Sequence, residues 1–372
     1  MKDVLKVMSV FGTRPEAIKM CPLVIKMQED SQIESIVCVS AQHRQMLDQV
    51  LEIFGVKADI DLNIMRKTQT LTTITSDVLN KMSEVFAEIK PNIVLVHGDT
   101  TTTFAVALSA YYHQIPVGHV EAGLRSFDIY SPYPEEINRR LTSQIAALHF
   151  APTVGNMENL KNENISTPIY VTGNTVIDAL SVTVKKGYVF KNEQIKKLNF
   201  SKNKLILVTA HRRENLGAPL ENICNAIKKI AAKYSSAIIV YPVHLNPAVQ
   251  NTVFKMLGKT ENIHLTEPID VEDMHNLMAK ATLVLTDSGG LQEEAPSLGI
   301  PVLVMRTETE RPEAVKAGTV TVVGVKEQDI YQKTCALLDD KVLYDKMANA
   351  VNPYGDGRAS ERIIKAIKEW AY

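Results

Sequence analysis

The segment Leu283–Pro296 combines residue types that could bind a nucleotide diphosphate. Three apolar residues of strand type run directly into Asp287-Ser288-Gly289-Gly290, and a helix-forming stretch with Glu293 and Glu294 follows. Two glycines let a ligand approach the backbone closely, and the helix start offers unpaired N–H groups and a positive dipole end to a phosphate. A carboxylate further along the helix can accept hydrogen bonds from ribose hydroxyls. The alternative interpretation is a glycine-rich turn that binds nothing.

Groups suited to proton transfer and to anion binding occur elsewhere in the chain. The carboxylates are Asp99, Glu121, Glu135 and Glu136, and the cationic candidates are His211, Arg212, Arg213 and Arg311. Carboxylates tuned by burial and by neighbours can act as general base and acid, and arginines can clamp a diphosphate leaving group. No G-x-S-x-G nucleophile motif is present. His97 and Asp99 lack a third ligand at the spacing of a known metal site, so no metal is expected.

Short apolar runs alternate with amphipathic helical segments along the chain. The runs are rich in Val, Ile and Leu, as strands buried on both faces require. In the first half, the expected strands are Leu5–Phe11, Ile33–Ser40, Ile93–His97, Pro116–Val120, Leu148–Ala151 and Ile169–Thr172. In the second half, they are Leu205–Thr209, Ala237–Tyr241, Ile263–Thr266, Leu283–Thr286, Val302–Met305 and Val320–Val323. This alternation predicts an α/β protein with two Rossmann-like domains, each built on six parallel strands.

Charged and polar residues follow the predicted strands in both halves. Ligands of open α/β sheets bind outside the carboxyl ends of the strands. Because both halves carry such residues there, we expect a charged ligand in a cleft between the domains. The first domain is predicted at residues 1–172, joined by a C-terminal helix at about 358–372, and the second at 173–357. The Lys/Asn-rich stretch Lys185–Lys204 is expected to be a solvated linker.

Composition limits the class of protein. The chain has 372 residues, enough for two domains. A net charge of −1 argues against a nucleic-acid-binding protein held by bulk electrostatics. The four cysteines are scattered without a C-x-x-C pair, which is typical of buried thiols in a reducing compartment. No apolar run approaches the ~18 residues needed to span a membrane, and the N-terminus lacks a signal-peptide pattern. A cytoplasmic enzyme without membrane association is therefore expected.

Ten segments, in order, resemble one family of enzymes. They read FGTRPEAIKM, SAQHRQMLDQVL, VLVHGDTTTTFA, GHVEAGLRS, YSPYPEEINRR, VTGNTVID, TAHRRENLG, YPVHLNP, LTDSGGLQEEAPSLG and PVLVMRTETERPEAV. They are similar to the motifs of the bacterial non-hydrolysing UDP-N-acetylglucosamine 2-epimerases, from about residue 5 to about residue 365. The resemblance implies the glycosyltransferase-B architecture, in which two Rossmann-like domains face each other across a cleft. It also implies a homodimer, for which the segment Thr73–Ile89 is a candidate surface.

The same resemblance implies a reaction that needs no cofactor. The family interconverts UDP-N-acetylglucosamine and UDP-N-acetylmannosamine and so supplies N-acetylmannosamine for cell-surface polysaccharide. Simple deprotonation at C2 is unfavourable because that carbon is not next to a carbonyl group. The family instead removes the C2 proton while UDP departs from C1, and UDP adds back to the 2-acetamidoglucal after C2 is protonated on the other face. This route requires a base, an acid and a tight clamp for UDP.

Roles for individual residues follow from the same motifs. The family's catalytic positions match Asp99, Glu121, Glu135 and His211, without telling which carboxylate removes the proton in which direction. Its contacts to UDP and sugar match Arg14, Lys19, Ser288, Gly289, Gly290, Glu294 and Arg311. Among these, Ser288–Gly290 are implied to cradle phosphate and Glu294 to contact ribose.

A second binding site is also implied by the resemblance. In several bacterial members, an additional UDP-N-acetylglucosamine molecule activates the enzyme. The residues in the corresponding motifs are Gln42, His43, Gln45, Gln69, Arg212 and His244. Where such members tend to carry arginine, this chain has Thr68, which weakens the expected site unless Arg66 or Lys67 compensates. The alternative is that these residues cap helices or line a solvated groove.

Two other enzyme classes fit the same motifs less well. A hydrolysing relative would admit water to the intermediate and release UDP irreversibly. A glycosyltransferase of the same architecture would need an acceptor site, and no acceptor motif is recognisable. A non-enzymatic sugar-nucleotide sensor is disfavoured because every catalytic motif residue is present.

Overall fold

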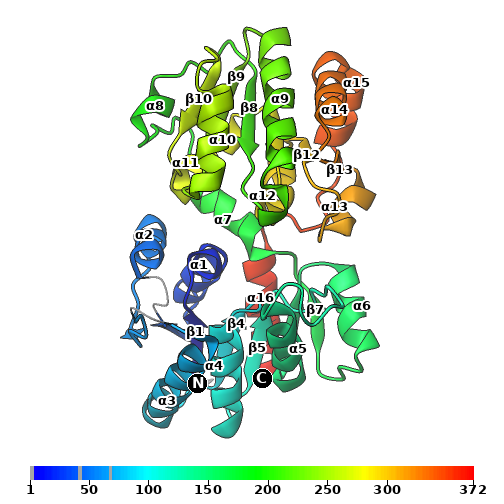
Figure 1. The fold of residues 1–372 in the computed structure, drawn as a ribbon. Helices are drawn as coiled ribbons and strands as arrows, with labels where there is room; N and C mark the ends of the chain where they lie inside the picture. The colour runs from blue at the N-terminus through cyan, green and yellow to red at the C-terminus, as the bar shows by residue number, and fades with distance from the viewer. Residues whose placement is uncertain (1–3, 41–43, 67–68) are drawn as a thin grey trace. The chain divides into compact units, whose positions relative to one another are not determined.

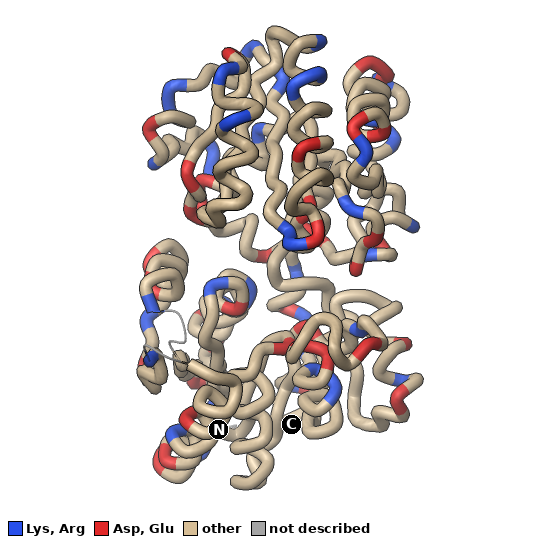
Figure 2. The backbone as a smooth tube through the Cα atoms, in the orientation of Figure 1, with Lys and Arg blue, Asp and Glu red and all other residues tan. Residues whose placement is uncertain are grey.

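The computed structural model describes residues 4–40, 44–66 and 69–372 of the chain. It divides into two compact units, one formed by Met1–Val182 with Tyr354–Tyr372 and the other by Thr183–Pro353. Each unit is an α/β layer structure around a parallel sheet (Figure 1). Charged residues of both signs are spread over both units (Figure 2), in keeping with the near-zero net charge.

The first unit contains a parallel sheet of seven strands within the described residues, in the order β3-β2-β1-β4-β5-β6-β7. The strands are β1 (Leu5–Phe11), β2 (Ile33–Val39), β3 (Ile60–Asp61), β4 (Ile93–His97), β5 (Val117–Val120), β6 (Leu148–Ala151) and β7 (Ile169–Val171). The sequence predicted six of them, and the expected count was wrong by one. The missed strand β3 has two residues, too few for a recognisable apolar run.

Helices cover both faces of this sheet and create two cores. The helices are α1 (Arg14–Gln28), α2 (Arg44–Phe54), α3 (Leu71–Ile89), α4 (Thr101–Tyr112), α5 (Glu135–Ile145), α6 (Val154–Asn162), α7 (Thr175–Thr183) and α16 (Ala359–Ala371). Helices α1, α2 and α16 share one core with the sheet, and α3 and α4 share the other. The C-terminal helix α16 is anchored at its start, because Asp178 accepts the N–H groups of Ala359 (3.1 Å) and Ser360 (2.8 Å).

The second unit has six parallel strands, in the order β10-β9-β8-β11-β12-β13. They are β8 (Leu205–Thr209), β9 (Ile238–Pro242), β10 (Ile263–Thr266), β11 (Leu283–Thr286), β12 (Val302–Val304) and β13 (Val320–Val322), as the sequence predicted to within one residue at each end. The helices are α8 (Glu193–Lys196), η1 (Arg213–Asn215), α9 (Ala218–Lys233), α10 (Pro247–Leu257), α11 (Val271–Ala279), α12 (Gly289–Ser297), α13 (Pro312–Ala317), α14 (Glu327–Asp339) and α15 (Lys341–Ala348).

The Lys/Asn-rich stretch expected to be a solvated linker is mostly exposed, and it is anchored to the second unit at a few points. Asp273 on α11 accepts hydrogen bonds from the Tyr188 hydroxyl (2.8 Å) and from the backbone N–H of Lys191 and Asn192 (both 2.9 Å). Ile195 is fully buried. The composition indicated the exposure of the segment, but it did not show the few contacts that attach it to the second unit.

Both sheets contain a topological switch point, where ligands of open α/β sheets bind. In the first sheet, β1 lies between β2 and β4, so the chain leaves β1 and β4 toward opposite faces. In the second sheet, β8 lies between β9 and β11. The residues that follow these four strands are therefore candidates for ligand binding. No helix within residues 4–40, 44–66 and 69–372 is both long and apolar enough to cross a bilayer.

Candidate active site

Glu16 holds the loops after β1 and β4 of the first unit together. Its carboxylate accepts the N–H groups of Gly12 (3.0 Å) and Thr13 (2.7 Å) and the hydroxyl of Thr100 (2.8 Å). Glu16 is 2% exposed, so these bonds satisfy a buried charge. Arg14 is the first residue of α1 and is half-buried there. Glu16 and Thr100 are 84 residues apart, so the sequence did not show that Glu16 would join the two loops.

Glu121 is a carboxylate of the first unit with charged and polar partners on several sides. It follows β5 with a φ of 62°, a conformation that a non-glycine residue rarely adopts. Lys19 forms an ion pair with it, Asn174 donates a hydrogen bond (2.9 Å), and the Nε2 atom of His97 lies 3.6 Å away. Burial alone would raise the pKa of Glu121, but Lys19 and His97 outweigh burial and hold that pKa well below its usual value. The carboxylate is therefore an anion that can accept a proton.

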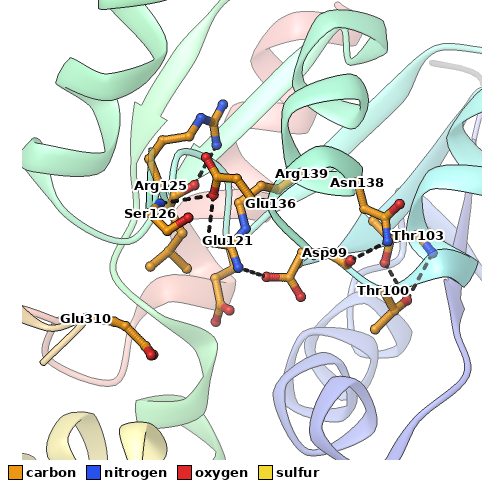
Figure 3. Close-up of polar contacts among 12 residues, drawn as sticks. Asp99, Thr100, Thr103, Glu121, Arg125, Ser126, Glu136, Asn138, Arg139 and Glu310 are labelled. Atoms are coloured by element: carbon orange, nitrogen blue, oxygen red, sulfur yellow. Dashed lines mark hydrogen bonds and ion pairs between the residues drawn. The ribbon is translucent and has the colours of Figure 1, made fainter. Parts of the chain in front are cut away.

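Asp99 provides a second carboxylate, which is held by α5. Arg139 pairs with the Asp99 carboxylate, and the Asn138 amide donates to the Asp99 carbonyl oxygen (3.0 Å), as Figure 3 shows. Gly98 separates Asp99 from His97 and has a φ of 65°. A Cβ atom at Gly98 would lie 3.9 Å from Glu121 Oε1. The turn at Gly98 thus brings Asp99 and Glu121 into the same neighbourhood.

The adjacent glutamates on α5 have different surroundings. Glu136 is fully buried and accepts the N–H group of Ser126 (3.0 Å; Figure 3). It also accepts the N–H of Phe127 (3.3 Å) and the Nε–H of Arg140 (3.0 Å). Glu135 is the first residue of α5 and is half-buried. Glu136 therefore fixes the loop before α5, which leaves Glu135 as the candidate for proton transfer.

His119 stabilises the turn at Gly98 through a hydrogen bond to the Gly98 carbonyl group. Its Nε2 atom lies 2.7 Å from the Gly98 carbonyl oxygen, and the side chain is fully buried. Burial lowers the pKa of His119 to about 3. The ring is therefore neutral at physiological pH, and its Nε2–H donates to the carbonyl group.

Asp287 organises the corresponding loops of the second unit. One oxygen of this fully buried carboxylate accepts the N–H groups of His211 (2.8 Å) and Arg212 (2.8 Å) and the amide of Asn215 (3.0 Å). The other oxygen, Oδ1, has no hydrogen-bond partner among the described residues. A residue after β11 thus fixes the loop after β8. The sequence placed Asp287 in the LTDSGG motif without assigning it a role.

His211 stacks on His244, with ring centroids 5.1 Å apart and planes inclined by 17°. Desolvation lowers the pKa of His211, although the nearby charge of Asp287 acts in the opposite direction. His244 accepts the N–H of Asn246 at its Nδ1 atom (3.1 Å). The structure therefore brings together one predicted catalytic residue and one predicted activator-site residue.

The start of α12 is surrounded by cationic side chains. A Cβ atom at Gly289 would lie 3.6 Å from the Nη2 atom of Arg311 and 3.8 Å from that of Arg212. Arg311 also pairs with Glu293, which is 1% exposed. Ser288 is the N-cap residue, and its own N–H donates to Thr286 (2.8 Å). The N-terminus of α12 and the guanidinium groups of Arg311 and Arg212 together form an anion-binding environment.

Glu294 lies one turn into the same helix. A Cβ atom at Gly290 would lie 3.0 Å from its Oε1 atom, so the glycine leaves space beside this carboxylate. The side chain of Glu294 is 14% exposed. Its carboxylate therefore remains accessible next to the predicted phosphate-binding turn.

The predicted activator residues are only partly described. Gln42, His43 and Thr68 lie outside the described residues. Gln45 is exposed in the first turn of α2, and the Gln69 amide lies 3.4 Å from the Ile64 carbonyl oxygen. Within the described ranges, no three His, Cys, Asp or Glu side chains are placed to hold a metal ion.

Sequence reasoning assigned no role to five residues that organise the loops of the two units: Glu16, His119, Asn174, Arg139 and Asp287. Each lies inside one of the ten motifs, which was the available signal. Their partners lie in distant segments, so motif membership alone could not show what they hold.

Comparisons with known proteins identify the family to which the chain is similar. A family model described as UDP-N-acetylglucosamine 2-epimerase matches residues 25–368. The chain is 56% identical to a UDP-N-acetylglucosamine 2-epimerase of Bacillus subtilis, over 98% of this chain and 95% of that protein.

Two solved structures are also similar. The Neisseria meningitidis UDP-GlcNAc 2-epimerase bound to UDP-GlcNAc has a TM-score of 0.88 and 50% identity, over 98% of this chain and 100% of that chain. The Methanocaldococcus jannaschii UDP-GlcNAc 2-epimerase in complex with UDP-GlcNAc and UDP has a TM-score of 0.79 and 34% identity, over 98% of this chain and 100% of that chain. The chain therefore belongs to the UDP-N-acetylglucosamine 2-epimerase family.

Proposed function

We propose that this protein reversibly interconverts UDP-N-acetylglucosamine and UDP-N-acetylmannosamine without a cofactor and without net hydrolysis. The observation that carries the proposal is the state of Glu121, a buried carboxylate kept anionic by Lys19 and His97. Such a carboxylate can remove the proton from C2 only if the electron pair of the C2–H bond can form a new bond. Departure of UDP from C1 allows that electron pair to form the C1=C2 double bond.

The proposed first step is an elimination. A carboxylate of the first unit removes the proton from C2, and the C–H electron pair becomes the C1=C2 double bond. The C1–O bond breaks, and UDP leaves with that electron pair as an anion, giving 2-acetamidoglucal. The second step runs in reverse: C2 receives a proton on the opposite face, and a UDP oxygen attacks C1. Atoms and charge balance with no external reactant.

We assign the proton transfers to Asp99, Glu121 and Glu135. Lys19, which motif resemblance placed among UDP contacts, pairs with Glu121 and keeps it ionised. Arg139 gives Asp99 a similar neighbour of opposite charge. The direction in which each carboxylate acts is left open, since reversibility requires both an acid and a base.

We assign the UDP clamp to the start of α12 and its cations. Ser288, Gly289 and Gly290 offer backbone N–H groups, and Arg311 lies next to Gly289. Positive groups fixed before the reaction stabilise the charge that develops on a departing diphosphate. Arg14 is proposed as a further contact of UDP and His211 as a catalytic residue, both by motif.

The experiment that tests this function uses the intact protein with UDP-N-acetylglucosamine in deuterated water, followed by NMR. We expect both epimers to appear, with deuterium at C2 of each. Irreversible accumulation of UDP and free sugar would instead identify a hydrolase. An unchanged substrate would contradict enzymatic turnover of this nucleotide sugar.

We also propose that a second UDP-N-acetylglucosamine molecule activates the enzyme through Gln42, His43, Gln45, Gln69, Arg212 and His244. The support is motif resemblance and the clustering of Arg212 and His244 near His211 and Gly289. Pure UDP-N-acetylmannosamine should then react only after a trace of the glucosamine form is added. Gln45→Ala should abolish that activation, whereas Gln49→Ala, an exposed neighbour on α2, should retain it. Prompt turnover of the pure mannosamine form would contradict the activator site.

A cytoplasmic homodimer is proposed as the working form. The four cysteines are free and buried, which suits a reducing compartment. The outward face of α3, the candidate dimer surface, is mainly polar, whereas exposed apolar side chains occur on and near α5, including Tyr133, Ile137 and Leu141. Sedimentation equilibrium at micromolar concentration tests the dimer, and a monomer would contradict it.

A further inference from the structure

A buried histidine on α11 connects Glu294 to the start of the second unit. The Nε2 atom of His275 lies 3.3 Å from Glu294 Oε2, and its Nδ1 atom lies 2.7 Å from the Thr183 hydroxyl. His275 is 2% exposed. A polar ring so deeply buried needs partners for both nitrogens, and these two groups supply them.

The partner on the Nδ1 side is itself fixed. Asn276 donates from its amide to the Thr183 carbonyl oxygen (2.7 Å) and accepts the N–H of Lys185 (2.9 Å). The hydroxyl of Thr183 therefore has a defined position. When that hydroxyl donates to Nδ1, the proton of the neutral ring resides on Nε2 and points to the Glu294 carboxylate.

The Glu294 carboxylate is thus held through one of its oxygens. His275 lies against Oε2, whereas Gly290, which has no Cβ atom, leaves space beside Oε1. Glutamate has three side-chain torsions, and fixing them before a ligand arrives reduces the cost of binding. A carboxylate held in one orientation can accept hydrogen bonds from two adjacent hydroxyls at once.

We propose that His275 is a positioning residue that orients Glu294 to bind the 2′- and 3′-hydroxyls of the nucleotide ribose. This inference rests on the proposed function, because it takes the ligand to be a uridine diphosphate. It makes His275 a determinant of the preference for ribose over deoxyribose, although the ring itself does not contact the sugar.

The test compares two substitutions that each keep one side of the ring. Asparagine places its amide near the position of Nδ1, so His275→Asn keeps the contact with Thr183 and loses the contact with Glu294. Glutamine places its amide near the position of Nε2, so His275→Gln keeps the contact with Glu294. Isothermal titration calorimetry gives the Kd of UDP and of 2′-deoxyUDP for each protein, with thermal unfolding measured alongside.

In the wild-type protein, we expect UDP to bind roughly 10- to 100-fold more tightly than 2′-deoxyUDP, as hydrogen bonds to a charged group imply. His275→Gln should keep most of this ratio. His275→Asn should reduce it about fivefold or more, chiefly by weakening UDP. Glu294→Gln should reduce it as well, and adding His275→Asn to that variant should cause little further change.

A wild-type-like ratio in His275→Asn would overturn the proposal, as would equal losses for both nucleotides in both His275 variants, which a purely structural role predicts. Failure of the wild-type protein to bind UDP would instead contradict the proposed function. If His275→Asn does not fold, ¹⁵N NMR of wild-type His275 gives the answer. Its Nε2 resonance should shift with UDP and not with 2′,3′-dideoxyUDP, and equal shifts would also overturn the proposal.

Discussion

The carboxylates that follow strands of the two sheets are held by different kinds of partner. In the first unit, Glu121 and Asp99 are paired through their side chains with Lys19 and Arg139. In the second unit, Asp287 accepts mainly backbone N–H groups. The first arrangement pairs two carboxylates with cations and lowers the pKa of Glu121, whereas the second fixes the loop that carries cationic side chains. The same sheet geometry therefore supports a proton-transfer group in one unit and an anion-binding group in the other.

The largest expected effect comes from removing the charge of Glu121. Glu121→Gln is nearly isosteric and keeps the site buried, so kcat should fall by about 10²- to 10⁴-fold, the range for a general acid or base. Steady-state kinetics and deuterium incorporation at C2 measure the loss. Glu88→Gln, on the exposed side of α3, is the matched control and should be unchanged. Near-wild-type turnover in Glu121→Gln would remove this carboxylate from the mechanism.

In the second unit, substitution of Arg311 should weaken the binding of the diphosphate. Arg311→Ala would leave Glu293, which is 1% exposed, without its cation, and breaking such a pair costs about 3–5 kcal/mol of stability. Arg311→Lys avoids this loss because it keeps the charge and changes only the planar guanidinium. Calorimetry should show UDP binding about tenfold more weakly and uridine binding unchanged. Equal weakening of both ligands would show that Arg311 does not contact phosphate.

Sequence patterns predicted most of the strands of both sheets and the polar loops that follow them, for a physical reason. Strands buried on both faces must be apolar throughout, so runs such as Leu5–Phe11 and Leu283–Thr286 appeared with correct bounds. The strand β3 escaped because two residues carry no pattern. The polar loops were predictable as well, since they follow strands of a parallel sheet.

The pairing of charges was not predictable. Lys19 and Glu121 are 102 residues apart in sequence, and they meet only because the sheet order brings their elements together. Glu135 and Glu136 are neighbours in sequence, but a helix turns by about 100° per residue. Helix phase alone decides that Glu136 is buried and Glu135 is not.

Two substitutions of Asp287 distinguish the effect of its hydrogen bonds on stability from the effect of its charge. Asp287→Ala removes the acceptor of three N–H donors and should lower the free energy of unfolding by at least about 2 kcal/mol. Asp287→Asn can keep those bonds, because its amide nitrogen can occupy the position of the unpartnered Oδ1 atom. Thermal unfolding should therefore distinguish the two variants clearly. Equal destabilisation would show that the charge, rather than the acceptor, holds the loop.

The smallest expected effect is a shift in pH dependence caused by Lys19. The pKa of Glu121 is lowered in the folded protein, so its contribution to stability is full above the unfolded value of about 4.3 and is lost as pH falls toward the folded value. Lys19→Met removes the cation but keeps the burial, so the folded pKa should rise. The acid limb of kcat/KM should then move upward by about one pH unit or more. Lys26→Met, on the same helix but paired with exposed Glu29, should leave the limb in place. An unmoved limb in Lys19→Met would show that Lys19 does not set the charge of Glu121, and the contrast between the two units would lose its electrostatic basis.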